Sequence, residues 1–304
     1  MKFLALAAIL ASASAVTVTT EHRASFREYT QKFGKVYQTQ GEHERRLSIY
    51  AENMAEFAKL NRSLRARGRD EIHGANAFTD MTREEFNEIY LTGAVVDEAF
   101  FPKLDTVKEF PTVTSVKATR GSYSLYDEGL VTPVKDQAQC GSCWAFAATE
   151  TVESAWAVAG NDLTEFSPQQ IVSCDTGNGD YGCSGGMPSS AFEYVISAGG
   201  MATEEDYPYT STTGITGTCQ DFTVSGGTVS EWAYAQDACL PGSSACVEDS
   251  DAIASALKSY GGIAIAIDAS AFFSYTGGVM TSDSCSSDPS SLDHAIQIVG
   301  YDAS

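Results

Sequence analysis

The chain has 304 residues, of which 43% are hydrophobic and 11% aromatic, and its formal net charge is −21. This composition excludes a disordered protein, and the length suffices for one or two domains with a packed core. Residues 1–120 hold 17 basic and 16 acidic residues, whereas residues 121–304 hold 2 basic and 24 acidic residues. A second part this acidic argues against nucleic acid and anionic membranes as partners.

Residues 1–15 have the pattern of a secretory signal peptide. Lys2 precedes the apolar run FLALAAIL, and the small residues Ala13, Ser14 and Ala15 end the stretch. The run is too short to span a membrane, so we expect no membrane anchor. Entry into the secretory pathway leads to an extracellular destination or to an acidic compartment of the lysosome or vacuole type. Disulfides form along this route, and the eight cysteines are therefore first interpreted as bridges.

Two amphipathic helices are predicted after this signal. Residues 21–35 place Phe26, Tyr29 and Phe33 at spacings of three and four, and residues 42–67 repeat apolar side chains with the same rhythm. A generic helical hairpin would show this rhythm. The second helix also carries a spaced series that exceeds the generic pattern, namely Glu42, Arg46, Tyr50, Asn53, Phe57 and Asn61.

A second motif follows in residues 74–80, GANAFTD. Thr82 and Glu85 then have the spacing of a capping box, which predicts the start of another helix. Residues 93–120 lose all periodicity. We interpret them as an exposed linker in which the leader is cleaved.

Cys143 lies in the stretch QCGSCWAF, residues 139–146. The segment after it is Ala-rich, largely apolar and of helical length up to Gly160, so Cys143 is expected at a helix N-terminus. There the unpaired backbone N–H groups and the helix dipole favour a thiolate, the nucleophilic form of cysteine. The alternative interpretation is a disulfide cysteine, which is the usual state in a secreted chain.

Two further elements are predicted in the second part of the chain. Ser167, Pro168 and Gln170 supply the N-cap, the first-turn proline and the N3 partner of a helix. The stretch SLDHAIQIVGYD alternates apolar and polar residues around His294, which predicts a strand.

Together these motifs resemble the papain family of cysteine proteases. QCGSCWAF matches C-G-[SA]-C-[WY], a signature of the papain and cathepsin nucleophile, and residues 129–146 are close to the family consensus. The spaced series resembles the ERFNIN motif of cathepsin L-like propeptides, with Tyr for Phe and Phe for Ile. Residues 74–80 match the G-x-N-x-F-x-D motif of the same propeptides. The resemblance covers nearly the whole chain.

The resemblance implies an α+β, papain-like two-lobed fold. A helical lobe and a β-barrel-like lobe would follow an α-helical inhibitory propeptide. The implied boundaries are a signal peptide at 1–15, a helical propeptide at 16–92, a linker at 93–120 and a peptidase domain at 121–304.

The resemblance also implies a cysteine endopeptidase zymogen that works through an acyl-thioester. Cys143 would be the nucleophile, and His294, the only histidine in residues 121–304, would form a thiolate–imidazolium pair with it. Gln137 would donate its side-chain N–H to the oxyanion of the tetrahedral intermediate. No metal or cofactor is implied. The expected partners are protein or peptide substrates and the chain's own propeptide, and the expected state is a monomer.

One group of the family's catalytic site has no counterpart in this sequence. In the family, an asparagine in an N-S-W motif orients the histidine, but no asparagine occurs here after Asn178. The resemblance therefore implies a fragment or an impaired product. The alternatives are a pseudoenzyme that binds peptides without cleaving them, and a leader that inhibits other proteases of the family.

Further residues are assigned by the same resemblance. GCSGGMP would be the substrate-binding strip, where Gly185 and Gly186 let an extended peptide approach the backbone. The pocket for the residue before the scissile one would be apolar and would favour bulky hydrophobic side chains. Its lining positions are Met187, Ala266, Leu292 and Ala295.

The cysteines are paired by family position. The resemblance implies the disulfides Cys140–Cys183 and Cys174–Cys219. Cys239 and Cys246 have no family counterpart, but they flank the short segment LPGSSA and are expected to close a small loop. Cys285 is left over. A redox role for Cys140 and Cys143 is the competing interpretation, but no thioredoxin-like βαβ unit precedes them.

Overall fold

The computed structural model describes residues 16–91, 121–177, 179–235, 249–281, 284–286, 288 and 291–302. The predicted signal peptide, the linker and the predicted Cys239–Cys246 disulfide lie outside these ranges. The chain forms two compact units. Unit 1 contains the chain up to Glu85 together with Ala271–Met280, and unit 2 contains Phe86–Ser270 together with the chain from Thr281 onward. Within the described ranges, no helix is long and apolar enough to cross a membrane.

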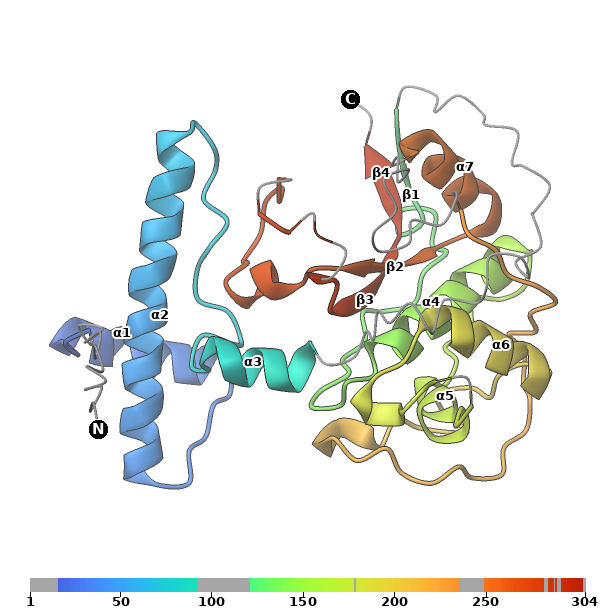
Figure 1. The fold of residues 1–304 in the computed structure, drawn as a ribbon, viewed down its shortest axis with the longest axis horizontal. Helices are drawn as coiled ribbons and strands as arrows, with labels where there is room; N and C mark the ends of the chain where they lie inside the picture. The colour runs from blue at the N-terminus through green and yellow to red at the C-terminus, as the bar shows by residue number, and fades with distance from the viewer. Residues whose placement is uncertain are drawn as a thin grey trace, which may run out of the picture. The chain divides into compact units, whose positions relative to one another are not determined.

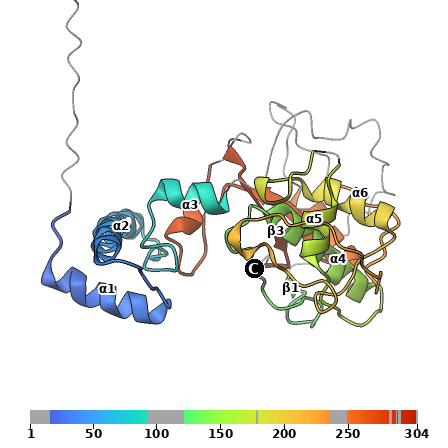
Figure 2. The same ribbon diagram turned by 90° about the horizontal axis from the view of Figure 1, so that it is seen from below.

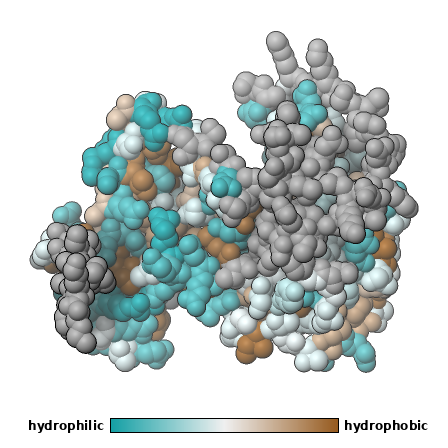
Figure 3. Space-filling view, viewed as in Figure 1, coloured by the Kyte–Doolittle hydropathy of each residue, from teal (hydrophilic) through white to brown (hydrophobic). Residues whose placement is uncertain are grey.

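Unit 1 contains the two predicted leader helices, α1 (Thr20–Lys32) and α2 (Gln40–Ala66). Figure 2 shows α2 end-on with α1 lying across it. The apolar stripes of the two helices meet in a cluster of buried side chains: Phe26, Tyr29, Leu47 and Tyr50. The outer faces carry polar residues, and most of the visible leader surface is hydrophilic (Figure 3). The apolar residues predicted from their spacing therefore form the interface between α1 and α2.

The polar residues of the spaced series fix the following loop to α2. Asn53 Nδ2 donates to the carbonyl oxygens of Thr79 and Met81 at 2.9 and 2.8 Å. Arg46 donates to the carbonyl oxygen of Asp80 at 3.0 Å and forms an ion pair with Glu85. The side chains of Asn53 and Arg46 thus supply hydrogen-bond donors to loop carbonyls that lie outside any helix or strand.

The helix α3 (Arg83–Tyr90) starts at the predicted capping box. The Glu85 backbone N–H donates to Thr82 Oγ1 at 3.1 Å, and the Thr82 N–H donates to Glu85 Oε2 at 2.9 Å. The prediction of this helix start from Thr82 and Glu85 is confirmed.

Residues 271–280 belong to unit 1, although they lie near the other end of the sequence. The Gly74 N–H donates to the Ser274 carbonyl at 2.8 Å, and the Thr276 N–H donates to the Ile72 carbonyl at 2.9 Å. Asn76 Nδ2 donates to three further carbonyls, those of Phe272, Phe273 and Tyr275. The start of the G-x-N-x-F-x-D motif and the two residues before it therefore bind a segment from the second half of the sequence.

Unit 2 is built around a buried helix that begins at Cys143 (Figure 1). Its helices are α4 (Cys143–Val158), α5 (Pro168–Cys174), α6 (Pro188–Ala198) and α7 (Ser250–Tyr260), with short 3-10 turns at Gly182–Ser184, Ser211–Thr213 and Ser270–Phe273. α4 packs against α5, α6, α7 and two strands. The core includes Trp144, Phe166, Ile171 and Met201. The apolar sequence predicted for this helix is explained by its contacts on several sides.

The described strands form two antiparallel pairs. β1 (Ser122–Ser124) pairs with β4 (Gly300–Asp302), and β2 (Ile263–Ile267) pairs with β3 (His294–Ile298). The strand predicted around His294 is confirmed, and His294 is its first residue. Within the described part of the chain, these pairs are the sheet component of the expected α+β fold.

One detail of the predicted start of α5 is wrong. Ser167 caps the helix as expected, because its Oγ accepts the Gln170 N–H at 3.1 Å, and Pro168 is in the first turn. The Gln170 side chain does not return to the cap. It donates to the Gly200 carbonyl at 3.2 Å and accepts the Ala202 N–H at 2.7 Å. These backbone groups are buried and have to be paired, so Gln170 joins two chain segments instead.

Candidate active site

Cys143 is the first residue of α4 and has 1% of its surface exposed. Ser142, at the N-cap, makes no side-chain cap hydrogen bond. The backbone N–H groups of Cys143 and Trp144 instead lie close enough to the sulfur to lower its pKa. The helix N-terminus thus opposes the rise that burial causes in the thiol pKa, but it does not produce the lowered pKa that the sequence predicted.

The strand β3 brings His294 to the same place. β3 packs on α4, and Ala295 forms a small buried cluster with Cys143 and Ala147. The Ala295 N–H also lies beside the Cys143 sulfur. The residue after His294 thus contacts the candidate nucleophile. His294 Nδ1 is buried and has no hydrogen-bond partner in the described part of the chain.

Burial acts against the charged form of both groups. Burial raises the pKa of the Cys143 thiol to about 12, against the opposing effect of the N–H groups of Ala295 and Trp144. Burial lowers the pKa of His294 to about 4. Each of these shifts acts against the charged form of its own group. The thiolate–imidazolium pair itself stays a prediction. Desolvation penalises each charge more than the helix N-terminus stabilises the thiolate.

Gln137 lies on the loop before α4, and its side chain is fixed at one end. Its Nε2 donates to the Cys140 carbonyl at 3.0 Å. A primary amide carries two N–H donors, so this bond leaves the second donor of Gln137 for another acceptor. The Cys140 N–H donates back to the Gln137 carbonyl at 3.3 Å, which closes the loop just before the nucleophile.

The two glycines of the predicted binding strip are needed for different reasons. Gly185 has a φ of 110°, a conformation open mainly to glycine. A Cβ at Gly186 would lie 2.4 Å from Asp180 Oδ1 and 2.6 Å from Trp144 Cδ2. The absent side chain of Gly186 would therefore point into the protein. Gly186 is therefore required by its packing against Trp144, in addition to the predicted approach of a substrate backbone.

The four predicted lining positions lie on different elements. Ala266 of β2 and Ala295 of β3 are direct cross-strand partners, so the structure brings these two together. Leu292 is half-buried just before β3, and Met187 is half-buried at the N-cap of α6. The Met187 N–H donates to Asp180 Oδ1 at 2.8 Å, which fixes the end of the strip.

Cys140 is bonded to Cys183 and Cys174 to Cys219, the pairings that the resemblance implied. The first disulfide joins the Gln137 loop to the binding strip. Cys143 and Cys285 are free cysteines, the first buried and the second exposed.

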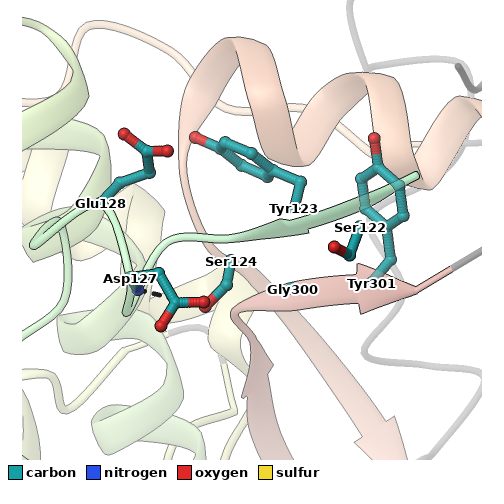
Figure 4. Close-up of a pocket in the computed structure, with 7 residues that line it drawn as sticks. All are labelled: Ser122, Tyr123, Ser124, Asp127, Glu128, Gly300 and Tyr301. Atoms are coloured by element: carbon teal, nitrogen blue, oxygen red, sulfur yellow. Dashed lines mark hydrogen bonds between the residues drawn. The ribbon is translucent and has the colours of Figure 1, made fainter.

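A separate open pocket of about 430 Å³ lies beside the β1–β4 pair. Figure 4 shows its residues, with Tyr123 and Tyr301 on the strands and Asp127 and Glu128 on the turn after β1. None of the predicted site residues lines it. In the part of the chain that the structure describes, no group of three or more histidine, cysteine and acidic residues could hold a metal ion.

Residues that support the site were missed in the sequence. Tyr209 bonds the Gln137 loop, Asp180 bonds Met187, and Lys135 bonds the buried Glu153 of α4. Lys135 carried a usable signal, because it is one of two basic residues in an acidic half. Tyr209 and Asp180 carried none, since their partners are distant in sequence or depend on the path of a loop.

A buried free cysteine at a helix N-terminus, packed against a strand that begins with histidine, is typical of cysteine–histidine hydrolases. The model of the papain family cysteine proteases matches residues 121–304, and that of the cathepsin propeptide inhibitor domain (I29) matches residues 26–86. The chain belongs to the papain family of cysteine proteases and carries a cathepsin-type propeptide inhibitor domain. The family and fold predicted from the sequence are confirmed.

Relatives and solved structures agree with this assignment. A cysteine proteinase of Trypanosoma brucei brucei is 38% identical over 98% of this chain and 62% of its own length. Cysteine proteinase B of Leishmania mexicana is 36% identical over 98% of this chain and 63% of its own. The chain thus spans about three-fifths of the length of these relatives. The digestive procathepsin L2 proteinase of Tenebrio molitor is 30% identical with a TM-score of 0.75, covering 92% of this chain and 85% of that one. A recombinant stem bromelain precursor is 31% identical with a TM-score of 0.72, covering 93% and 83%.

Proposed function

We propose that this chain acts as a cysteine endopeptidase that is made as an inhibited zymogen. The observation that carries the proposal is the position of Cys143, a free cysteine at the first residue of α4, against the start of β3 at His294. Cys140, three residues away, is held in a disulfide and is not available as a nucleophile.

The reaction follows from these groups. The Cys143 sulfur attacks the peptide carbonyl carbon, and its proton passes to His294. The Gln137 amide and the Cys143 N–H donate to the resulting oxyanion. His294 then protonates the leaving amine as the C–N bond breaks, which leaves an acyl-thioester. A water molecule, deprotonated by His294, attacks this thioester and releases the acid and the thiol.

The burial of both groups is compatible with this sequence of steps. Moving a proton from thiol to imidazole leaves the net charge of the pair unchanged, so a buried site opposes this transfer less than it opposes either charge alone. A neutral imidazole can also accept the proton directly as the sulfur attacks.

A peptidyl epoxysuccinate label tests the proposal. We expect the processed protein to be labelled once per molecule, and Cys143→Ser to abolish labelling. Cys285→Ser is the matched control, because Cys285 is free and exposed but lies outside the proposed site, and labelling should remain. Labelling that follows Cys285, or no labelling of folded protein, would contradict the peptidase function.

The proposed lining of the pocket predicts substrate preference. The lining carries no charged side chain at Met187, Ala266, Leu292 and Ala295. A basic substrate side chain would lose its hydration in this pocket and gain no counter-charge, which is unfavourable. We expect kcat/KM for Phe-Arg peptides to exceed that for Arg-Arg peptides by at least about tenfold. Fluorogenic peptides that differ only at this position measure it, and equal rates would refute the assignment.

The leader is proposed to act as the chain's own inhibitor and to be removed by cleavage within residues 93–120. The match of residues 26–86 to a propeptide inhibitor domain and the bonds from Asn76 to residues 272–275 support this role. The protein would enter the secretory pathway through residues 1–15, reach an extracellular or acidic lysosome-like or vacuole-like location, and cleave peptide or protein substrates as a monomer.

A further inference from the structure

Tyr209 contacts the loop that carries Gln137 and the N-cap of α4 at the same time. Its hydroxyl donates to the Gln137 carbonyl at 2.9 Å and makes a second hydrogen bond of 2.9 Å with Ser142 Oγ. A phenol has a single O–H to donate, so Ser142 must be the donor in the second bond. One hydroxyl therefore joins the two segments that flank the Cys140–Cys183 disulfide.

The rest of the Tyr209 side chain is fixed as well. Its ring packs edge-on against Phe146 of α4, with the ring centroids 4.9 Å apart. Its backbone N–H donates to Glu204 Oε1 at 2.8 Å. Burial raises the pKa of Tyr209 to about 12, so the hydroxyl keeps its proton at any pH at which a protease works. The donor to the Gln137 carbonyl is thus permanent and held in place.

The loop needs such a restraint. Ala138, directly after Gln137, has a φ of 51°, which lies in the left-handed region that residues with a Cβ avoid. Its N–H donates to Asp136 Oδ1 at 2.8 Å, and the next N–H, of Gln139, donates to the Thr212 carbonyl at 3.2 Å. A strained residue persists only where its surroundings hold it. Here one bond within the loop, to Asp136, and two bonds from other segments, with Thr212 and Tyr209, do so.

We infer that Tyr209 is a positioning residue for the oxyanion donor. Its hydroxyl holds the Gln137 backbone against the strain at Ala138, while the Cys140 carbonyl orients the Gln137 amide. The second N–H of that amide is then presented to the oxyanion. This inference rests on the proposed peptidase function, in which Gln137 acts on the tetrahedral intermediate.

Tyr209→Phe removes the hydroxyl and keeps the ring against Phe146. In processed protein we expect kcat to fall about tenfold with KM within about twofold, because the oxyanion donor acts in the transition state. In a Gln137→Ala background, which alone should cost about 100-fold in kcat, Tyr209→Phe should cost less than about twofold more. Adding Ala138→Gly, which relieves the strain, should restore most of the activity lost in Tyr209→Phe.

Tyr194→Phe is the matched control. Tyr194 is a half-buried tyrosine of α6 whose hydroxyl bonds Gln170, away from the loop, and kcat should not change. Two results would overturn the inference. One is a loss of kcat from Tyr209→Phe that is as large in the Gln137→Ala background as in the wild type, and the other is a loss of kcat that Ala138→Gly does not restore.

A measurement without catalysis separates this inference from the proposed function. In the intact, unprocessed chain, Tyr209→Phe should raise hydrogen exchange at the Cys140 N–H, which bonds the Gln137 carbonyl, by at least about tenfold. Should processed wild-type protein lack activity, the proposed function fails, and faster exchange still supports the restraint. Unchanged exchange in Tyr209→Phe overturns the restraint whatever the activity.

Discussion

Replacing Lys135 by methionine should lower the free energy of unfolding by about 3 kcal/mol, because it leaves a buried carboxylate without its counter-charge. Lys135 Nζ lies 2.6 Å from Glu153 Oε2, and the two side chains are 11% and 1% exposed. The other Glu153 oxygen accepts the Phe166 N–H at 2.7 Å, and Thr132 Oγ1 donates to Oε2. Burial raises the pKa of Glu153, and Lys135 opposes that rise. Urea unfolding followed by tryptophan fluorescence measures the change.

The other basic residue of the acidic half supplies the control. Lys258 is exposed, and its Nζ lies 5.4 Å from the centre of the Tyr123 ring, so Lys258→Met should cost about 0.5 kcal/mol or less. Glu153→Gln added to Lys135→Met removes the buried charge and should recover at least half of the loss. A Lys135→Met variant as stable as Lys258→Met would show that the pair contributes nothing.

The sequence predicted best those features that depend on residues close together in the sequence. The stripe of Phe26 and Tyr29, the capping box of Thr82 and Glu85 and the helix start at Cys143 are local patterns, and each forms as predicted. The position of His294 relative to Cys143 followed from family resemblance, because no local pattern in the 150 intervening residues indicates that β3 packs on α4.

The rest depends on burial and on distant partners, which a sequence does not display. Gln170 has the spacing of a cap partner, but it bonds Gly200 and Ala202 because their buried backbone groups need partners. The charge state of Cys143 was predicted from the helix N-terminus alone, and the opposing effect of burial could not be seen. Tyr209 acts on Gln137 from 72 residues away.

Raising the pH from about 5 to about 8 should lower the free energy of unfolding by about 2 kcal/mol. Asp180 and Asp175 are 5% and 4% exposed, and their carboxyl groups lie close enough for each to influence the pKa of the other. Burial, and then the adjacent Asp175, raise the pKa of Asp180 from 3.8 to about 8. The folded protein therefore keeps a proton that the unfolded chain loses near pH 4. Stability that is fully present below that pH is lost as the pH rises towards 8.

Among the described residues, no basic side chain contributes to the pKa of Asp175 or Asp180. Tyr194 of α6 faces Asp175, the Met187 N–H donates to Asp180, and the charged group that acts on Asp180 is the Asp175 carboxylate. Glu150 adds to the trend, since burial raises its pKa to about 7. A fold whose stability falls between pH 5 and pH 8 agrees with the proposed acidic compartment.

Asp180→Asn tests the assignment, because asparagine can still accept the Met187 N–H but cannot titrate. The change in its unfolding free energy between pH 5 and pH 8 should be smaller than the change in the wild type, and the difference between the two should be about 1 kcal/mol or more. Asp268→Asn is the opposite control. Burial raises the pKa of Asp268, but hydrogen bonds from Ser270 and Ser286 outweigh it and hold the pKa low. Asp268→Asn should therefore lose stability at both pH values and keep the wild-type slope. An Asp180→Asn variant with the wild-type slope would mean that the pair is not the group that titrates.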